Sequence, residues 1–179
     1  MRKYIICAIA SSILFLSCDE AKEKLGYESE NGNEVDIYAG SLESTDVIKK
    51  WFDSYNARDL ETVESIEHDD IVLHAPNGMI IKSSQEHTEL AAQFLAAYPN
   101  AKWEILWSIS SDIDFSERSP ENWVTTCVTI TYGEGEEATT LQRIIDAKIV
   151  DGKIKTVFGY ERSISCLLYT SDAADDGLC

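Results

Sequence analysis

Hydrophobic residues recur every three or four positions in three segments of the chain. The first segment begins near residue 44, and its apolar positions are Val47, Ile48, Trp51, Phe52 and Tyr55. A shorter one follows Asp59, and a third begins at Ser83, which forms a capping box with Glu86 and continues to Pro99. This spacing is typical of helices that bury one face. We therefore expect three helices.

The hydrophobic period changes to two after the third helix. Apolar and polar side chains alternate from Trp103 to Ile109. Further strands rich in threonine and β-branched residues are expected at residues 123–132, 139–150 and 154–162. The pair Asp151-Gly152 is a strong signal for a tight hairpin between the last two. These segments predict a meander of long antiparallel strands.

A small hairpin interrupts the helical part of the chain. Short strands are expected at 71–74 and 79–82, on either side of the turn Pro76-Asn77-Gly78. The segment 41–165 therefore contains three helices, an inserted hairpin and a strand meander. We expect it to fold as one α+β domain.

The amino-terminal segment predicts secretion and lipid attachment. Residues 1–17 carry positive charge at the start, followed by an apolar run of about a dozen residues, which is too short to span a membrane. Leu14–Cys18 resembles the bacterial lipobox, with Phe15 in place of the usual leucine. The resemblance implies cleavage before Cys18 and acylation of its thiol. The acyl chains would anchor the protein without a spanning helix.

Residues 18–40 are acidic and polar, which predicts a flexible tether between the acylated cysteine and the domain. We expect the protein in the cell envelope, on the outer membrane in preference to the inner one, with its domain in the periplasm or at the cell surface. The net charge of −17 argues against nucleic acid as a partner, because such binding depends on Lys and Arg. Contact with the membrane is expected through the lipid anchor only.

The carboxyl-terminal segment 166–179 differs from the rest of the chain. Its first eleven residues, CLLYTSDAADD, resemble a translated sequencing adapter, so we expect this tail to be non-native. No chemistry is assigned to Cys166 or Cys179. Cys127 then remains within the domain, and we expect it to be a small buried side chain in a strand.

The order of elements, together with the segments WFDSYNARDLETVESIEHDDIVLHAPNG and DGKIKTVFGYER, resembles the nuclear transport factor 2-like superfamily, including its SnoaL-like branch. The resemblance extends from Ser44 to Arg162. It implies a cone-shaped, curved antiparallel sheet wrapped around the three helices, a pocket at the open end, and a homodimer through the outer face of the sheet. The superfamily includes isomerases, dehydratases, cyclases and binding domains, so the fold alone does not fix the function.

Steroid-isomerase relatives carry a catalytic aspartate just before the proline of the strand turn, where this chain has Ala75. Alanine cannot accept a proton, so that mechanism is not expected here. His74 is the nearest titratable residue, and Asp70 precedes it by four positions on the same strand. The pair is a candidate general base with its orienting carboxylate. Alternatively, His74 is satisfied by backbone and water, and Asp70 caps a turn.

Six residues are candidates for binding a ligand inside the predicted cone: Trp51, Tyr55, Trp103, Trp107, Arg143 and Tyr160. The aromatic residues suit a small apolar or aromatic ligand, and they suit a hydrophobic core equally well. Arg143 alternates in register with Leu141 and Ile145. It either faces the pocket, where it requires a carboxylate partner, or joins a dimer surface.

The three histidines His68, His74 and His87 lack metal-binding spacing, and no glycine-rich phosphate loop is present, so we expect no metal and no cofactor. Three hypotheses for function follow. The leading one is a small-molecule-binding or accessory domain without catalysis. The second is a SnoaL-like isomerase, lyase or hydrolase that uses His74 with Asp70. The third is a dimerisation or interaction module.

Overall fold

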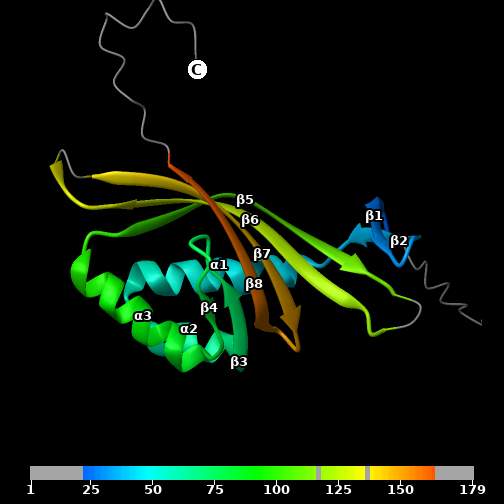
Figure 1. Ribbon diagram of the computed structural model, residues 1–179, viewed down its shortest axis with the longest axis horizontal. Helices are drawn as coiled ribbons and strands as arrows, with labels where there is room; N and C mark the ends of the chain where they lie inside the picture. Colours follow the sequence, from blue (N-terminus) through cyan, green and yellow to red (C-terminus); the bar gives the residue numbers. More distant parts are fainter. Residues whose placement is uncertain (1–21, 116–117, 136–137, 164–179) are drawn as a thin grey trace, which may run out of the picture.

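A computed structural model describes residues 22–115, 118–135 and 138–163 of the chain (Figure 1). The predicted signal segment, Cys18 and the predicted adapter-derived tail lie outside these ranges. No helix within them is long and apolar enough to cross a membrane.

Each of the three helices begins after a polar residue whose side chain accepts a hydrogen bond from the first turn. The helices are α1 (Leu42–Ala57), α2 (Leu60–Ile66) and α3 (Ser84–Ala97), capped by Ser41, Asp59 and Ser83. Arg58 adopts a left-handed conformation (φ 63°) that ends α1. The three predicted helices are confirmed, and the first begins at Leu42 instead of near residue 44.

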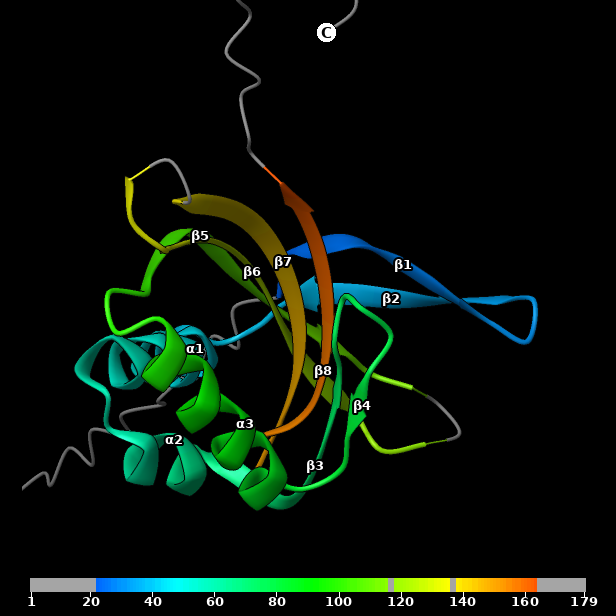
Figure 2. The ribbon, with the colours of Figure 1, turned by 60° about the vertical axis from the view of Figure 1, so that its left-hand side comes forward.

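The strands form one curved, mixed sheet of eight strands that does not close into a barrel. They are β1 (Lys24–Glu30), β2 (Asn33–Ala39), β3 (Glu67–His74), β4 (Ile80–Ile81), β5 (Lys102–Ile113), β6 (Glu121–Tyr132), β7 (Thr139–Val150) and β8 (Lys153–Ser163). Their order is β1-β2-β5-β6-β7-β8-β3-β4, and β3 is parallel to β8. The predicted meander is confirmed as β5 to β8. All three helices lie on one side of the sheet, which curves around them (Figure 2).

Most of the predicted tether, residues 24–39, is an ordered hairpin, so that prediction was wrong for these residues. The cause is the turn Asn31-Gly32, in which both residues have positive φ (51° and 83°), as a tight type I′ turn requires. Strand β2 then extends the sheet by pairing with β5, with Ile37 opposite Ile113. Backbone pairing at a sheet edge thus orders a segment that buries little apolar surface.

The hydrophobic core lies between the helices and the inner face of the sheet. Its fully buried members come from every layer: Ile48, Val63, Ile71, Val124, Val128 and Ile154. Cys127 is buried in β6, as expected from its place in the strand.

Candidate functional site

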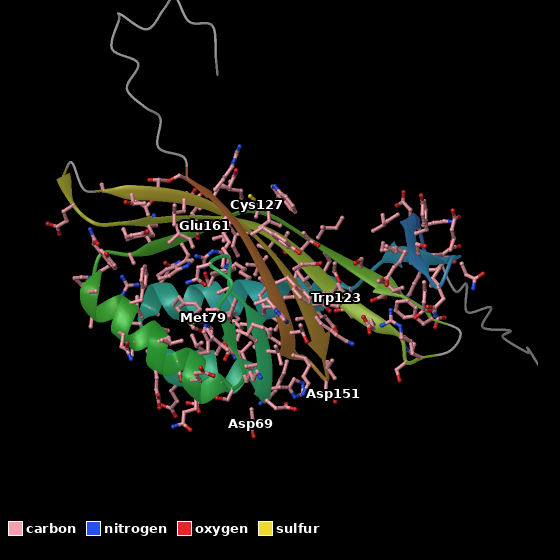
Figure 3. All side chains as sticks on the ribbon, in the orientation of Figure 1. Asp69, Met79, Trp123, Cys127, Asp151 and Glu161 are labelled. Atoms are coloured by element: carbon pink, nitrogen blue, oxygen red, sulfur yellow. The ribbon has the colours of Figure 1, made fainter. Side chains whose placement is uncertain are left out.

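A cavity of about 450 Å³ lies between α1, α3 and the inner face of the sheet. Aromatic side chains form much of its wall: Trp51, Phe52, Tyr55, Phe94, Trp103 and Tyr132. Trp103 stacks on Tyr55 at 5.2 Å between ring centroids and meets Phe94 edge to face at 5.9 Å. Such contacts stabilise a wall of fixed shape. Figure 3 labels two further lining residues, Met79, just before β4, and Glu161, on β8.

Glu67, the first residue of β3, is completely buried beside this cavity. Its carboxylate accepts three hydrogen bonds. Trp51 Nε1 and His87 Nδ1 each lie 2.7 Å from Oε1, and Ser84 Oγ lies 2.8 Å from Oε2. A buried carboxylate requires such partners, because its removal from water is otherwise very costly. The donors come from α1 and α3, so this one side chain joins both helices to the sheet.

A second hydrogen bond links His87 to the cavity wall. His87 Nε2 lies 2.9 Å from the hydroxyl oxygen of Tyr55. A carboxylate can only accept hydrogen bonds, so Nδ1 of His87 must donate to Glu67. In the neutral imidazole, Nε2 then accepts a hydrogen bond from the Tyr55 hydroxyl. Glu67, His87 and Tyr55 therefore form a continuous chain from a buried charge to the cavity, which we call the buried triad.

The environment of Tyr55 keeps its phenol neutral. Burial raises the pKa of Tyr55 well above its usual value, and the negative charge of Glu67 raises it further. The positive charge of Arg143 opposes these two effects in part and lowers this pKa. At neutral pH, Tyr55 is therefore a protonated phenol that can donate one hydrogen bond and accept others.

Arg143 lies in the cavity wall. Of the two placements expected from the sequence, the pocket and a dimer surface, the structure has the first. Arg143 is opposite Glu161 in the pairing of β7 with β8, and its Nε lies 3.0 Å from Oε2 of Glu161. The two side chains are 33% and 25% exposed, so this ion pair is at the open end of the cavity and in reach of solvent. A ligand carrying negative charge could compete with Glu161 for the guanidinium.

Three of the predicted aromatic ligand contacts, Trp51, Tyr55 and Trp103, line the cavity. Trp107 and Tyr160 do not: they are 47% and 61% exposed and point away from the helices. Their predicted placement on the inner face was wrong.

The reasons lie in the strand geometry. A β-bulge between Ile105 and Trp107 adds one residue to β5 and reverses the alternation after it. Tyr160 is three positions after the buried Val157 in β8, and an odd offset places it on the opposite face.

The predicted pair of His74 and Asp70 is not formed. Four residues along a strand span about 13 Å, too far for a hydrogen bond between the two side chains. Asp70 instead accepts from Lys155, which lowers the pKa of Asp70, and its side chain is 76% exposed. His74 is part of the cavity wall, but its ring stacks on Phe158 at 4.5 Å. Phe158 in turn stacks on Trp123, on the outer side of the sheet.

The buried triad was missed at the sequence level, although the sequence carries a signal for His87. On α3, His87 precedes Leu90, Ala91 and Phe94 by three, four and seven positions, which places it on the apolar face of that helix. Glu67 carries no such signal, because β3 is irregular between Glu67 and Val72, and Asp69 is exposed at the same parity. A polar residue on an apolar face, such as His87, is the kind that finds partners inside.

Comparisons with known proteins agree with this fold. Residues 48–157 match the family model described as SnoaL-like domain. One similar solved structure is a candidate ketosteroid isomerase from Kribbella flavida, with a TM-score of 0.54 and 16% identity over 69% of this chain and 81% of that one. Wild-type IdmH, a candidate polyketide cyclase from Streptomyces antibioticus, has a TM-score of 0.53 and 15% identity over 66% of this chain and 91% of that one. An LEH-like epoxide hydrolase from M. tuberculosis has a TM-score of 0.52 and 15% identity over 68% of this chain and 84% of that one. At these identities, the likeness is one of fold. No curated protein matches the sequence.

Proposed function

The chain belongs to the SnoaL-like domain family, and from that premise we propose that its domain binds a small, mainly apolar or aromatic molecule in the cavity between α1, α3 and the sheet. The cavity itself is the observation that carries the proposal. Its volume of about 450 Å³ lies in the range that holds small organic ligands. Its aromatic walls favour a planar ring, and the polar groups Tyr55, Arg143 and Glu161 could orient one.

Binding of plain and hydroxylated two-ring probes tests this proposal. Isothermal titration of the purified protein with naphthalene and with 2-naphthol should give saturable binding. Ala91, which lines the cavity on α3, is the position to fill: the variant Ala91→Trp should bind neither probe. Ala92, its exposed neighbour on the same helix, supplies the matched control, since Ala92→Trp should bind as the unchanged protein does. Absence of binding by the unchanged protein would sink the proposal.

We further propose that acylated Cys18 holds this domain at a membrane of the cell envelope. Since β1 begins at Lys24, only the few residues after Cys18 remain as a linker. At about 3.5 Å per extended residue, the six Cα–Cα steps from Cys18 to Lys24 reach roughly 20 Å at most. The domain would then sit close to the membrane surface. Metabolic labelling with palmitate tests the anchor: the label should be incorporated, and Cys18→Ser should abolish it.

A homodimer is a second candidate function, favoured by an apolar row on the outer face of the sheet. Strand pairing places four residues in this row, from β5 to β8: Trp107, Cys127, Ile144 and Tyr160. Trp107 and Tyr160 are exposed, whereas Cys127 is buried. Leu106 and Ile109 flank the row, each about half exposed. Exposed apolar patches of this kind mark interaction surfaces. Sedimentation of the purified protein should show a dimer that Trp107→Glu dissociates, and a monomer at high concentration would contradict it.

Catalysis by His74 with Asp70 is not supported by the geometry. The two side chains are held apart by strand spacing, and each has another partner. We therefore propose that any acid–base chemistry in this domain uses other residues.

A further inference from the structure

The hydrogen bonds of the buried triad all run in one direction, away from the cavity. The Tyr55 hydroxyl donates to His87 Nε2 at 2.9 Å, and His87 Nδ1 donates to Glu67 Oε1 at 2.7 Å. Because the hydroxyl proton of Tyr55 is used in this way, its oxygen has lone pairs left to accept a hydrogen bond. In the described part of the chain, no protein donor to this oxygen is seen. A ligand hydroxyl in the cavity could donate to it.

We propose that the buried triad is a general-base relay that removes the proton from a hydroxyl group of the bound ligand. The ligand class is then a small, mainly apolar phenol or enol. This inference rests on the proposed ligand cavity and names the chemistry of its occupant.

The transfer needs only the groups already described. The ligand O–H bond breaks and its proton forms a new O–H bond on Tyr55, while the original Tyr55 proton forms an N–H bond on His87 Nε2. Tyr55 is a neutral phenol before and after the step. The ligand becomes an oxyanion, and His87 becomes an imidazolium. No oxidant or reductant takes part.

Charges on both sides of the relay favour the transferred state. The Glu67 carboxylate, already 2.7 Å from His87 Nδ1, balances the imidazolium. The oxyanion forms beside Tyr55, in a cavity that the positively charged Arg143 also lines. Arg143 also faces Glu161, the remaining charged group that lines the cavity, so part of its charge is already neutralised. This ion pair limits the gain in oxyanion stability.

The hydrogen bond from Tyr55 to His87 satisfies two largely buried polar groups, as a structural network requires. It also connects the buried carboxylate of Glu67 to a hydroxyl of a residue that lines the cavity. Proton exchange with a ligand needs that second feature, whereas a structural role does not.

A chromophoric phenol tests the relay. 4-Nitrophenol is yellow as the phenolate and nearly colourless as the phenol. At a pH at which the free probe is mostly the phenol, the purified protein should turn it yellow, with its apparent acidity constant increased at least tenfold. His87→Gln keeps hydrogen-bonding capacity but cannot take up the proton, so it should bind the probe without colour. Tyr55→Phe should behave in the same way. Glu67→Gln should reduce the shift in acidity, a readout that a merely structural role would not move.

His68→Gln is the matched control, because His68 bonds to the Val150 carbonyl oxygen, a contact in which the triad takes no part. It should leave the colour unchanged. Binding of the probe as the phenol by the unchanged protein would overturn the relay, as would full colour in the His87→Gln and Tyr55→Phe variants. In both of those cases the cavity still binds 4-nitrophenol, so the proposed ligand cavity would stand without the relay. Failure of naphthalene and 4-nitrophenol to bind at all would instead remove the ligand cavity, and the relay with it.

Discussion

Nδ1 of His87 lies 2.7 Å from Oε1 of Glu67, a carboxylate with no exposed surface, and the two residues are 20 positions apart. One is on the inner face of α3 and the other begins β3. Their contact fixes the imidazole tautomer and so sets the direction of the hydrogen bond to Tyr55. The proposed proton transfer depends on this contact.

Loss of the Glu67 carboxylate should destabilise the protein strongly. Glu67→Ala leaves the donors of Trp51, Ser84 and His87 buried without their acceptor. We expect the free energy of unfolding to fall by about 3–5 kcal/mol in urea denaturation, as for other broken buried networks. Glu104 is exposed on β5, so Glu104→Ala is the control. It should change the free energy of unfolding by less than about 0.5 kcal/mol. Equal effects of the two substitutions would contradict the structural role of Glu67.

Alkaline pH should destabilise the protein through Tyr55. Burial and the charge of Glu67 raise the pKa of Tyr55 above its unfolded value of about 10. Above that pH the unfolded chain loses the proton while the folded one keeps it. Stability is therefore full below pH 10 and falls as the pH rises toward the folded pKa. Urea denaturation between about pH 9 and pH 11 should show this fall.

The fall should be smaller in Tyr55→Phe, which has no phenol to ionise at this position. Tyr27 is 59% exposed on β1, so Tyr27→Phe is the control and should retain the full pH dependence. An identical pH dependence in the unchanged protein and Tyr55→Phe would show that Tyr55 ionises freely when folded.

Ordering of the amino-terminal hairpin should depend on its turn. Gly32 has φ +83°, a conformation that a residue with a side chain adopts at a cost of about 1–2 kcal/mol. Gly32→Ala should therefore speed hydrogen exchange at Val35 and Ile37 in β2. Gly26 has open space around it and no positive φ, so Gly26→Ala should leave exchange nearly unchanged. Equal protection in both variants would argue against the turn as the cause.

Local patterns explain how much of the fold could be predicted. Helix caps such as Ser83 and turns such as Asp151-Gly152 act over a few residues, and both were confirmed. The Asn31-Gly32 turn has the same chemistry, but its polar flanks concealed it within an acidic segment. The bulge at Leu106 could not be predicted, because alternation along β5 gives no sign of an added residue until its pairing with β6 is known.

The candidate site was harder to predict because it depends on contacts between distant segments. The sequence identified four residues that line the cavity: Trp51, Tyr55, Trp103 and Arg143. Aromatic or charged residues on the apolar face of a helix or strand can be recognised from the sequence pattern alone. The pair of Glu67 and His87 was not identified, since it forms only when α3 packs over the start of β3. Sequence proximity favoured His74 and Asp70 instead, and strand spacing separates them.

A crystal structure of the protein with 4-nitrophenol tests the proposed relay most directly. We expect the ring of the probe in the cavity between Tyr55, Trp103 and Phe94, with its phenolic oxygen within hydrogen-bonding distance of the Tyr55 hydroxyl. A probe found on the outer face of the sheet, or a cavity filled by rearranged aromatic side chains, would contradict it.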